Sequence, residues 1–153
     1  MRQTMAQSVS LCLLLVVGCS GESFPRTYPV SGVVTYDGKP VEKATVNLVP
    51  TTADGRSASG ETDGDGKFTV TTYLSPTHSP AGALPGDYLV TVVKMEVPQM
   101  PEGLTQWEVQ AWSQKAGAPK PLLPKIYLDP AKSGLKATVQ AGTNAPLTFD
   151  LKD

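Results

Sequence analysis

The sequence predicts an all-β fold, an antiparallel sandwich of about seven strands. The 153 residues include 14 glycines and 14 prolines, a composition that suits short strands joined by many turns. Apolar residues make up 40% of the chain and charged residues only 18%, which is poor in the residues that favour helices. Short alternating or β-branched runs recur between turn-forming residues, as in β-sandwich domains.

The predicted strands differ in how clearly the sequence marks them. Residues 87–94 form the clearest strand because they are rich in β-branched and aromatic side chains. Alternation along 30–36 places Val30, Gly32, Val34 and Tyr36 on one face. The expected strands are 30–36, 44–49, 57–62, 67–72, 87–94, 135–139 and 147–151.

Two motifs with glycine predict tight turns. Asp37-Gly38 is a favoured dipeptide for a two-residue hairpin turn, in which both central residues need positive φ. The stretch TDGDGKF, residues 62–68, either forms the turn of a hairpin or opens a calcium-binding loop. An EF-hand loop starting at Asp63 would require oxygen ligands at Lys67 and Leu74, which neither residue supplies. We therefore expect a turn, with a weak calcium site at Asp63 and Asp65 as the alternative.

The N-terminus has the features of an export signal. Residues 9–17 form a mostly apolar run that is too short to span a bilayer but suits a signal peptide. The run ends in Val16-Val17-Gly18-Cys19, which resembles the bacterial lipobox. This resemblance implies a lipoprotein signal peptide over 1–18 and lipidation of Cys19. An ordinary secretory signal with an incidental cysteine is the alternative.

The two cysteines fit this interpretation. Cys12 lies in the predicted signal peptide and Cys19 would carry the lipid, so the mature chain is expected to have no free thiol and no disulfide. Residues 19–28 are polar and predict a tether, and the folded domain is expected over 29–153.

One segment, 95–123, interrupts the strand pattern. It contains both tryptophans, Trp107 and Trp112, and prolines lie on both sides of them. Thr105-Gln106-Trp107-Glu108 matches a capping box, which predicts a short helix over 106–115. We expect an irregular or short-helical insertion here.

Several stretches together resemble the carboxypeptidase regulatory-like domain. These stretches are VSGVVTYDGKPVEKATVNLVP, GETDGDGKFTV, ALPGDYLVTVVK and, near the end, LPKIYLDPAKSGLKATVQAG followed by LTFDL. The resemblance covers roughly residues 28–94 and 122–151 and implies a transthyretin-like, seven-stranded Greek-key sandwich in a bacterial cell-envelope lipoprotein. It supplies no catalytic residues, and the insertion 95–123 departs from it.

Catalysis, metal binding and nucleic-acid binding are not expected. His78 is the single histidine, and no mature thiol accompanies it, so neither a Cys–His pair nor a zinc site can be assembled. The formal net charge is −1 and no extended basic run is present, which disfavours a nucleic-acid partner. The sequence predicts a protein that is not an enzyme and has no cofactor, and an enzyme is the third alternative after a structural or binding protein and a carbohydrate-binding module.

The expected role is structural or binding work at the envelope, with the membrane reached through Cys19. Ser20, rather than an acidic residue, follows that cysteine, which favours the outer membrane. Trp107 and Trp112 are either core residues of a small subdomain or an exposed surface for a protein or a glycan. In a carbohydrate-binding module, the rival class, Trp107, Trp112 and Tyr127 would form the stacking platform.

Overall fold

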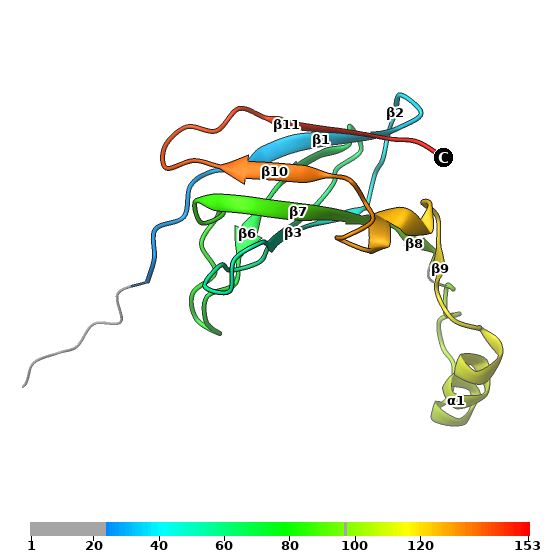
Figure 1. Cartoon of the computed structure of the whole chain (residues 1–153). Helices are drawn as coiled ribbons and strands as arrows, with labels where there is room; N and C mark the ends of the chain where they lie inside the picture. Colours follow the sequence, from blue (N-terminus) through cyan, green and yellow to red (C-terminus); the bar gives the residue numbers. More distant parts are fainter. Residues whose placement is uncertain (1–23, 97) are drawn as a thin grey trace, which may run out of the picture.

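The computed structural model describes residues 24–96 and 98–153. The predicted signal peptide 1–18 and Cys19, the predicted lipidation site, lie outside the described residues. The fold is mostly β, with largely antiparallel strand pairing, and the described residues include one α-helix. Two larger sheets share one hydrophobic core, and a helical arm extends from them (Figure 1).

The larger sheet has five strands in the order β10-β7-β3-β4-β6, and every neighbouring pair is antiparallel. The longest strand, β7, matches the clearest prediction from the sequence, and it pairs with β3 from Thr45 opposite Val93 to Pro50 opposite Tyr88. The strands are β3 (Thr45–Pro50), β4 (Ala58–Glu61), β6 (Thr71–Thr72), β7 (Gly86–Val93) and β10 (Lys136–Val139).

The second sheet is mixed rather than purely antiparallel. It is built around β1 (Ser31–Tyr36), which pairs antiparallel with β2 (Lys39–Pro40) and β5 (Lys67–Thr69). On its other side β1 runs parallel to β11 (Leu147–Leu151). The chain reaches β11 from β10 in the other sheet, so no tight hairpin imposes an antiparallel pairing on these two strands.

The predicted strand 67–72 changes sheets part-way along. Its first half, β5, pairs with β1, whereas its second half, β6, pairs with β4. The change occurs at Val70, a buried residue whose N–H donates to Val30 O across 3.2 Å. The turn at Asp63–Gly66 therefore joins strands that belong to different sheets, and the simple hairpin expected from TDGDGKF needs this correction.

The core lies between the two sheets. The alternation predicted for 30–36 is confirmed, because Val30 and Val34 are buried, as are Phe68 and Phe149 in the same sheet. The rings of these two phenylalanines stack with centroids 6.1 Å apart. Burying one large apolar side chain completely stabilises the folded state by about 1.5–3 kcal/mol. The largest apolar side chains that are fully buried are Val34, Val46, Leu48, Val70, Tyr88, Val90, Val92 and Leu151.

Residues 95–123 form an arm with its own secondary structure. The short strands β8 (Met95–Glu96) and β9 (Lys120–Pro121) pair antiparallel, and helix α1 (Gln106–Lys115) lies beyond them. Figure 1 shows α1 set apart from both larger sheets. A 3-10 helix, η1 (Lys125–Leu128), returns the chain to the core. Among the described residues, no helix has both the length and the apolar character needed to cross a bilayer.

Candidate binding surface on helix α1

Helix α1 begins where the sequence predicts it. The N–H of Glu108 donates to Thr105 Oγ1 across 3.4 Å, and the N–H of Thr105 donates to Glu108 Oε2 across 2.8 Å, which completes the expected capping box. The hydroxyl and backbone N–H of Thr105 hold the pKa of Glu108 below its ordinary value. Lys115 lies in the last turn, where a cation favours the helix dipole.

The side chains of α1 are not part of the core. None of its residues is buried, and Trp107 is 79% exposed, while Trp112 is partly covered. Residues five apart on a helix diverge by about 140°, so the two indoles face different directions. The interpretation of both tryptophans as core residues of a capping subdomain is therefore not what the structure shows. Trp107 is open to a partner.

A hollow of about 640 Å³ follows one side of the helix beside Trp107. Amide side chains accompany the ring, so this side combines a large apolar face with several hydrogen-bond donors and acceptors. Such a surface can stack on a flat ligand and bond to its polar edge. The lining residues are Thr105, Gln106, Trp107, Gln110, Ala111 and Gln114.

Tyr127 does not belong to this surface. It lies in η1 with only 9% of its surface exposed and packs in the hydrophobic core. Its phenol O–H donates to Lys152 O, and the N–H of Lys152 donates to the phenol oxygen, each across 2.9 Å. The proposed platform of Trp107, Trp112 and Tyr127 is therefore wrong in its third member. Tyr127 fixes the chain end instead.

The base of the arm carries exposed apolar side chains that sequence reasoning missed. They are at least two-fifths exposed and lie in the segments that carry the arm: Met95, Met100, Leu122 and Ile126. The signal was present in the sequence, because these apolar residues occur in a proline-rich stretch without strand alternation. Together with Trp107 they account for five of the seven large hydrophobic side chains that are exposed among the described residues.

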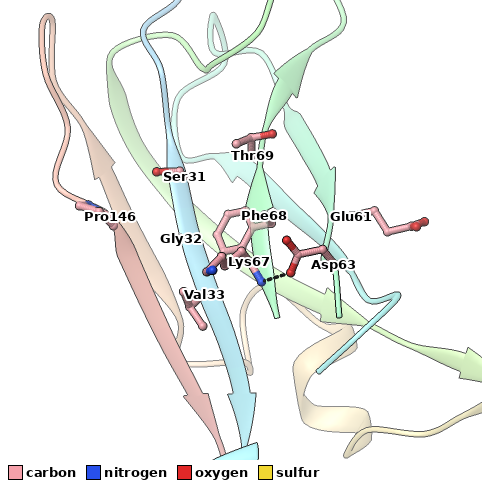
Figure 2. A pocket seen from close by; sticks show the side chains of 9 residues that line it. All are labelled: Ser31, Gly32, Val33, Glu61, Asp63, Lys67, Phe68, Thr69 and Pro146. Atoms are coloured by element: carbon pink, nitrogen blue, oxygen red, sulfur yellow. Dashed lines mark hydrogen bonds between the residues drawn. The ribbon is translucent and has the colours of Figure 1, made fainter. Parts of the chain in front are cut away.

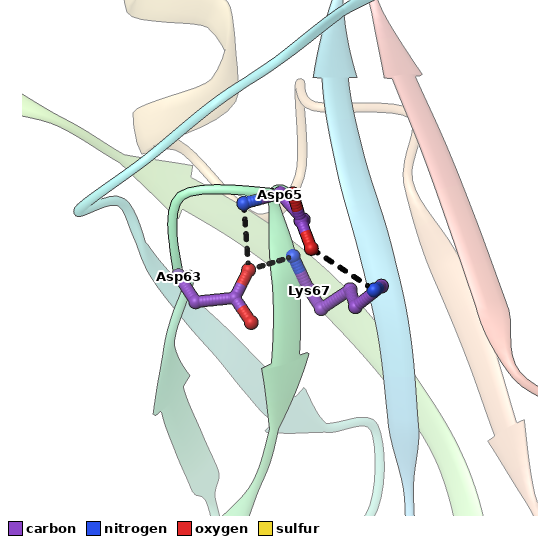
Figure 3. A network of polar contacts seen from close by, with 3 residues as sticks. All are labelled: Asp63, Asp65 and Lys67. Carbon is purple, nitrogen blue, oxygen red and sulfur yellow. Dashed lines mark hydrogen bonds and ion pairs between the residues drawn. The ribbon is translucent and has the colours of Figure 1, made fainter.

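The stretch TDGDGKF forms a closed turn. Asp63 Oδ1 accepts hydrogen bonds from the N–H groups of Asp65 and Lys67, each across 2.9 Å (Figure 3). The Lys67 ammonium lies 3.1 Å from Asp65 Oδ2, and this hydrogen bond raises the pKa of Lys67. Gly66 has φ of 73°, which a glycine adopts without strain. The aspartate oxygens thus serve the turn itself.

A second hollow, of about 560 Å³, lies over β1 and β5 (Figure 2). Its charged members include Asp63 and Lys67, which belong to the turn, and Glu61 on β4. The remaining lining is Ser31, Gly32, Val33, Phe68, Thr69 and Pro146. Within residues 24–96 and 98–153, no group of three or more His, Cys, Asp or Glu side chains is placed to hold a metal ion.

His78 packs against an aromatic ring. Its imidazole stacks on Phe24 with centroids 4.5 Å apart and planes 21° apart. The backbone around it closes a tight loop, in which His78 N–H donates to Ser75 O and Ser75 N–H donates to His78 O. The histidine thus connects the N-terminal segment to this loop.

Comparison of the chain with family models, with curated proteins and with solved structures finds no match.

Proposed function

We propose that this chain is a lipid-anchored, non-enzymatic protein of the bacterial cell envelope that binds a partner through helix α1. The observation that carries the binding role is Trp107, 79% exposed on a helix without a buried residue. Leaving a tryptophan in water forgoes the stabilisation that its burial would supply, and exposed aromatic rings often anchor interfaces.

The anchor rests on the N-terminal sequence. Val16-Val17-Gly18-Cys19 follows a mostly apolar run, and Cys19 is the single cysteine left after removal of residues 1–18. A thiol at that place is what thioether attachment of a diacylglycerol requires. Ser20 after the cysteine favours the outer membrane.

We further propose that the domain is a carboxypeptidase regulatory-like sandwich with transthyretin-like Greek-key topology. Support comes from the quoted sequence stretches and from two sheets around one core. This family is an accessory module even beside peptidases, which agrees with a binding role rather than turnover.

The binding role is tested by capture from native envelopes solubilised in detergent. We expect the wild-type protein to retain a reproducible set of envelope components and Trp107→Ala to lose it. Tyr73→Ala is the matched control, because it removes an exposed aromatic ring outside the arm. If Trp107→Ala and the wild type captured the same components, α1 would not be the binding surface.

A carbohydrate is the second candidate ligand, and the glutamines beside Trp107 favour it. An indole face stacks on the C–H face of a sugar, and the amides of Gln106, Gln110 and Gln114 can bond to hydroxyls. Glycan-array binding that disappears in Trp107→Ala and survives in Trp107→Phe would support a glycan. If a protein is captured and no glycan on the array is bound, the result would favour a protein partner.

A further inference from the structure

The end of the sandwich where the N-terminal segment joins it carries exposed aromatic rings. Tyr73 is 64% exposed and Phe24 is 37% exposed, and Phe24 stacks on His78. The loop 73–80 and Phe24 are called the anchor-side pole below. Figure 1 shows the N-terminal segment leaving one end of the sheets while α1 lies off the other end.

The N-terminal segment is fixed beside this pole by hydrogen bonds to the backbone of Ala81 and Ala83. Tyr28 and Ala83 exchange two hydrogen bonds, with N···O distances of 2.8 and 2.9 Å, and Thr27 Oγ1 donates to Ala81 O across 2.9 Å. The approach is close, because a Cβ on Gly82 would lie 2.1 Å from Tyr28 O. The chain therefore cannot move to another face without breaking this pairing.

Covalent reach then limits where a lipid on Cys19 can be. Phe24 follows Cys19 by five residues. A fully extended chain advances at most about 3.6 Å per residue, so Cys19 lies within roughly 18 Å of Phe24. A bilayer that holds the lipid chains is consequently within that distance of the anchor-side pole.

The pole has the chemistry of a surface that meets the membrane interface. From Phe68 to Gly86 the sequence has no Asp, Glu, Lys or Arg, so this segment itself brings no carboxylate, ammonium or guanidinium group that must be desolvated. Tyrosine and other amphipathic rings favour the boundary between head groups and water. The nearby Arg26 is exposed, lies with its guanidinium 5.4 Å from the centre of the Tyr28 ring, and can meet lipid phosphates.

We propose that the anchor-side pole rests on the phospholipid bilayer and that α1 consequently projects away from it. This inference depends on the proposed lipidation of Cys19 and adds an orientation to it. The lipid chains hold the protein at the membrane, and Phe24 and Tyr73 select the face that contacts the head groups. The binding surface around Trp107 is thereby presented to partners beyond the membrane.

The test uses the lipidated protein, extracted in detergent and reconstituted into phosphatidylcholine vesicles with nitroxide-labelled head groups. Ser79→Cys on the pole and Ser113→Cys on α1 are matched replacements of exposed serines. The thioether at Cys19 leaves the new cysteine as the single free thiol, so one fluorophore can be attached at each place. We expect quenching at residue 79 and none at residue 113.

Two further readings complete the test. Trp107 and Trp112 are the chain's two tryptophans, and we expect the nitroxide not to quench their intrinsic fluorescence. In the Ser79→Cys background, Tyr73→Ser and Phe24→Ser should each reduce quenching. Equal quenching at 79 and 113, or quenching of the tryptophans alone, overturns the orientation. The mass of the N-terminal peptide separates the two proposals: a peptide without lipid defeats both, whereas a lipidated chain unquenched at residue 79 defeats the orientation alone.

Discussion

Tyr127 and Lys152 are joined by two hydrogen bonds through one oxygen. The phenol O–H donates to Lys152 O and accepts from the N–H of Lys152, each across 2.9 Å. The bonds connect η1, at the base of the arm, to the chain just after β11. They thereby hold the end of β11, and with it the parallel strand pair, against η1.

We expect Tyr127→Phe to lower the free energy of unfolding by about 1–3 kcal/mol. The phenylalanine keeps the buried ring, but both hydrogen bonds are lost, and a typical one contributes about 0.5–1.5 kcal/mol. Urea denaturation measures the change, with Tyr73→Phe as the control because Tyr73 is exposed. Equal stability of the two variants would mean that the bonds contribute nothing net.

Gly60 is needed where the strand 67–72 passes from one sheet to the other. A Cβ on Gly60 would lie 2.0 Å from Thr69 O and 2.8 Å from Thr69 C, which no contact of real atoms allows. Backbone must move to relieve the clash, so we expect Gly60→Ala to destabilise the domain by about 1–3 kcal/mol or more.

Gly64→Ala provides the matched control for that change. A Cβ on Gly64 meets nothing within 4 Å, and its φ is not positive. Thermal unfolding should show a clear fall in Tm for Gly60→Ala and little change for Gly64→Ala. Similar Tm values for both variants would contradict the close approach of β4 to β5.

The strand 67–72 illustrates what the sequence reveals about this fold and what it does not. Alternation along the strand places Phe68, Val70 and Thr72 on one face, and all three are buried. It did not reveal the change of sheet at Val70. Alternation shows which residues of a strand share a face, but it does not show which other strands pair with that strand. The parallel pairing of β1 with β11 is hidden for the same reason, since partner choice depends on contacts far apart in the chain.

For a related reason, the sequence predicted some features of the candidate site correctly and others not. The capping box is local, so residues 105–108 sufficed to place α1 correctly. Exposure is not local, because the burial of Tyr127 comes from its packing on the hydrophobic core and not from a pattern in the neighbouring residues. The exposure of Met95 and Leu122 depends on how the arm leaves the sheets, which no short motif encodes.

The two aspartates of TDGDGKF should differ in their effect on stability. Asp63 Oδ1 accepts two backbone N–H groups, whereas the side chain of Asp65 is paired with an exposed lysine. We expect Asp63→Ala to cost about 1–2 kcal/mol, within the range found when capping side chains are removed. Asp65→Ala should cost well under 1 kcal/mol, as exposed ion pairs contribute little.

Calcium distinguishes the turn from a metal site in the same segment. Because Asp63 already serves the backbone, we expect millimolar calcium to leave the Tm of the domain unchanged. A ligand that binds the folded state would raise the Tm as its concentration exceeds its Kd. A calcium-dependent rise that disappears in the double variant Asp63→Asn/Asp65→Asn would overturn the interpretation as a turn alone.

Cys19→Ser tests the proposed lipid anchor, on which the proposed localisation depends. We expect the wild-type protein to incorporate labelled palmitate, to begin at Cys19 and to fractionate with membranes. Each buried methylene contributes about 0.8 kcal/mol, so two or three long chains anchor a protein far more firmly than one. Serine cannot form the thioether, so Cys19→Ser should abolish labelling and either release the domain or leave its unprocessed precursor.

Ser20→Ala is the matched control, because it changes the neighbouring residue and leaves the thiol in place. It should incorporate palmitate and remain in the membrane fraction as the wild type does. Wild-type protein that is unlabelled, cleaved at another bond and free of membranes would contradict the lipobox interpretation. The chain would then be a freely secreted domain, and contact between Phe24 and a bilayer would lose its basis. A labelled wild type with an unlabelled Cys19→Ser places the lipid on this thiol, since Cys12, the one other cysteine, is unchanged in the variant.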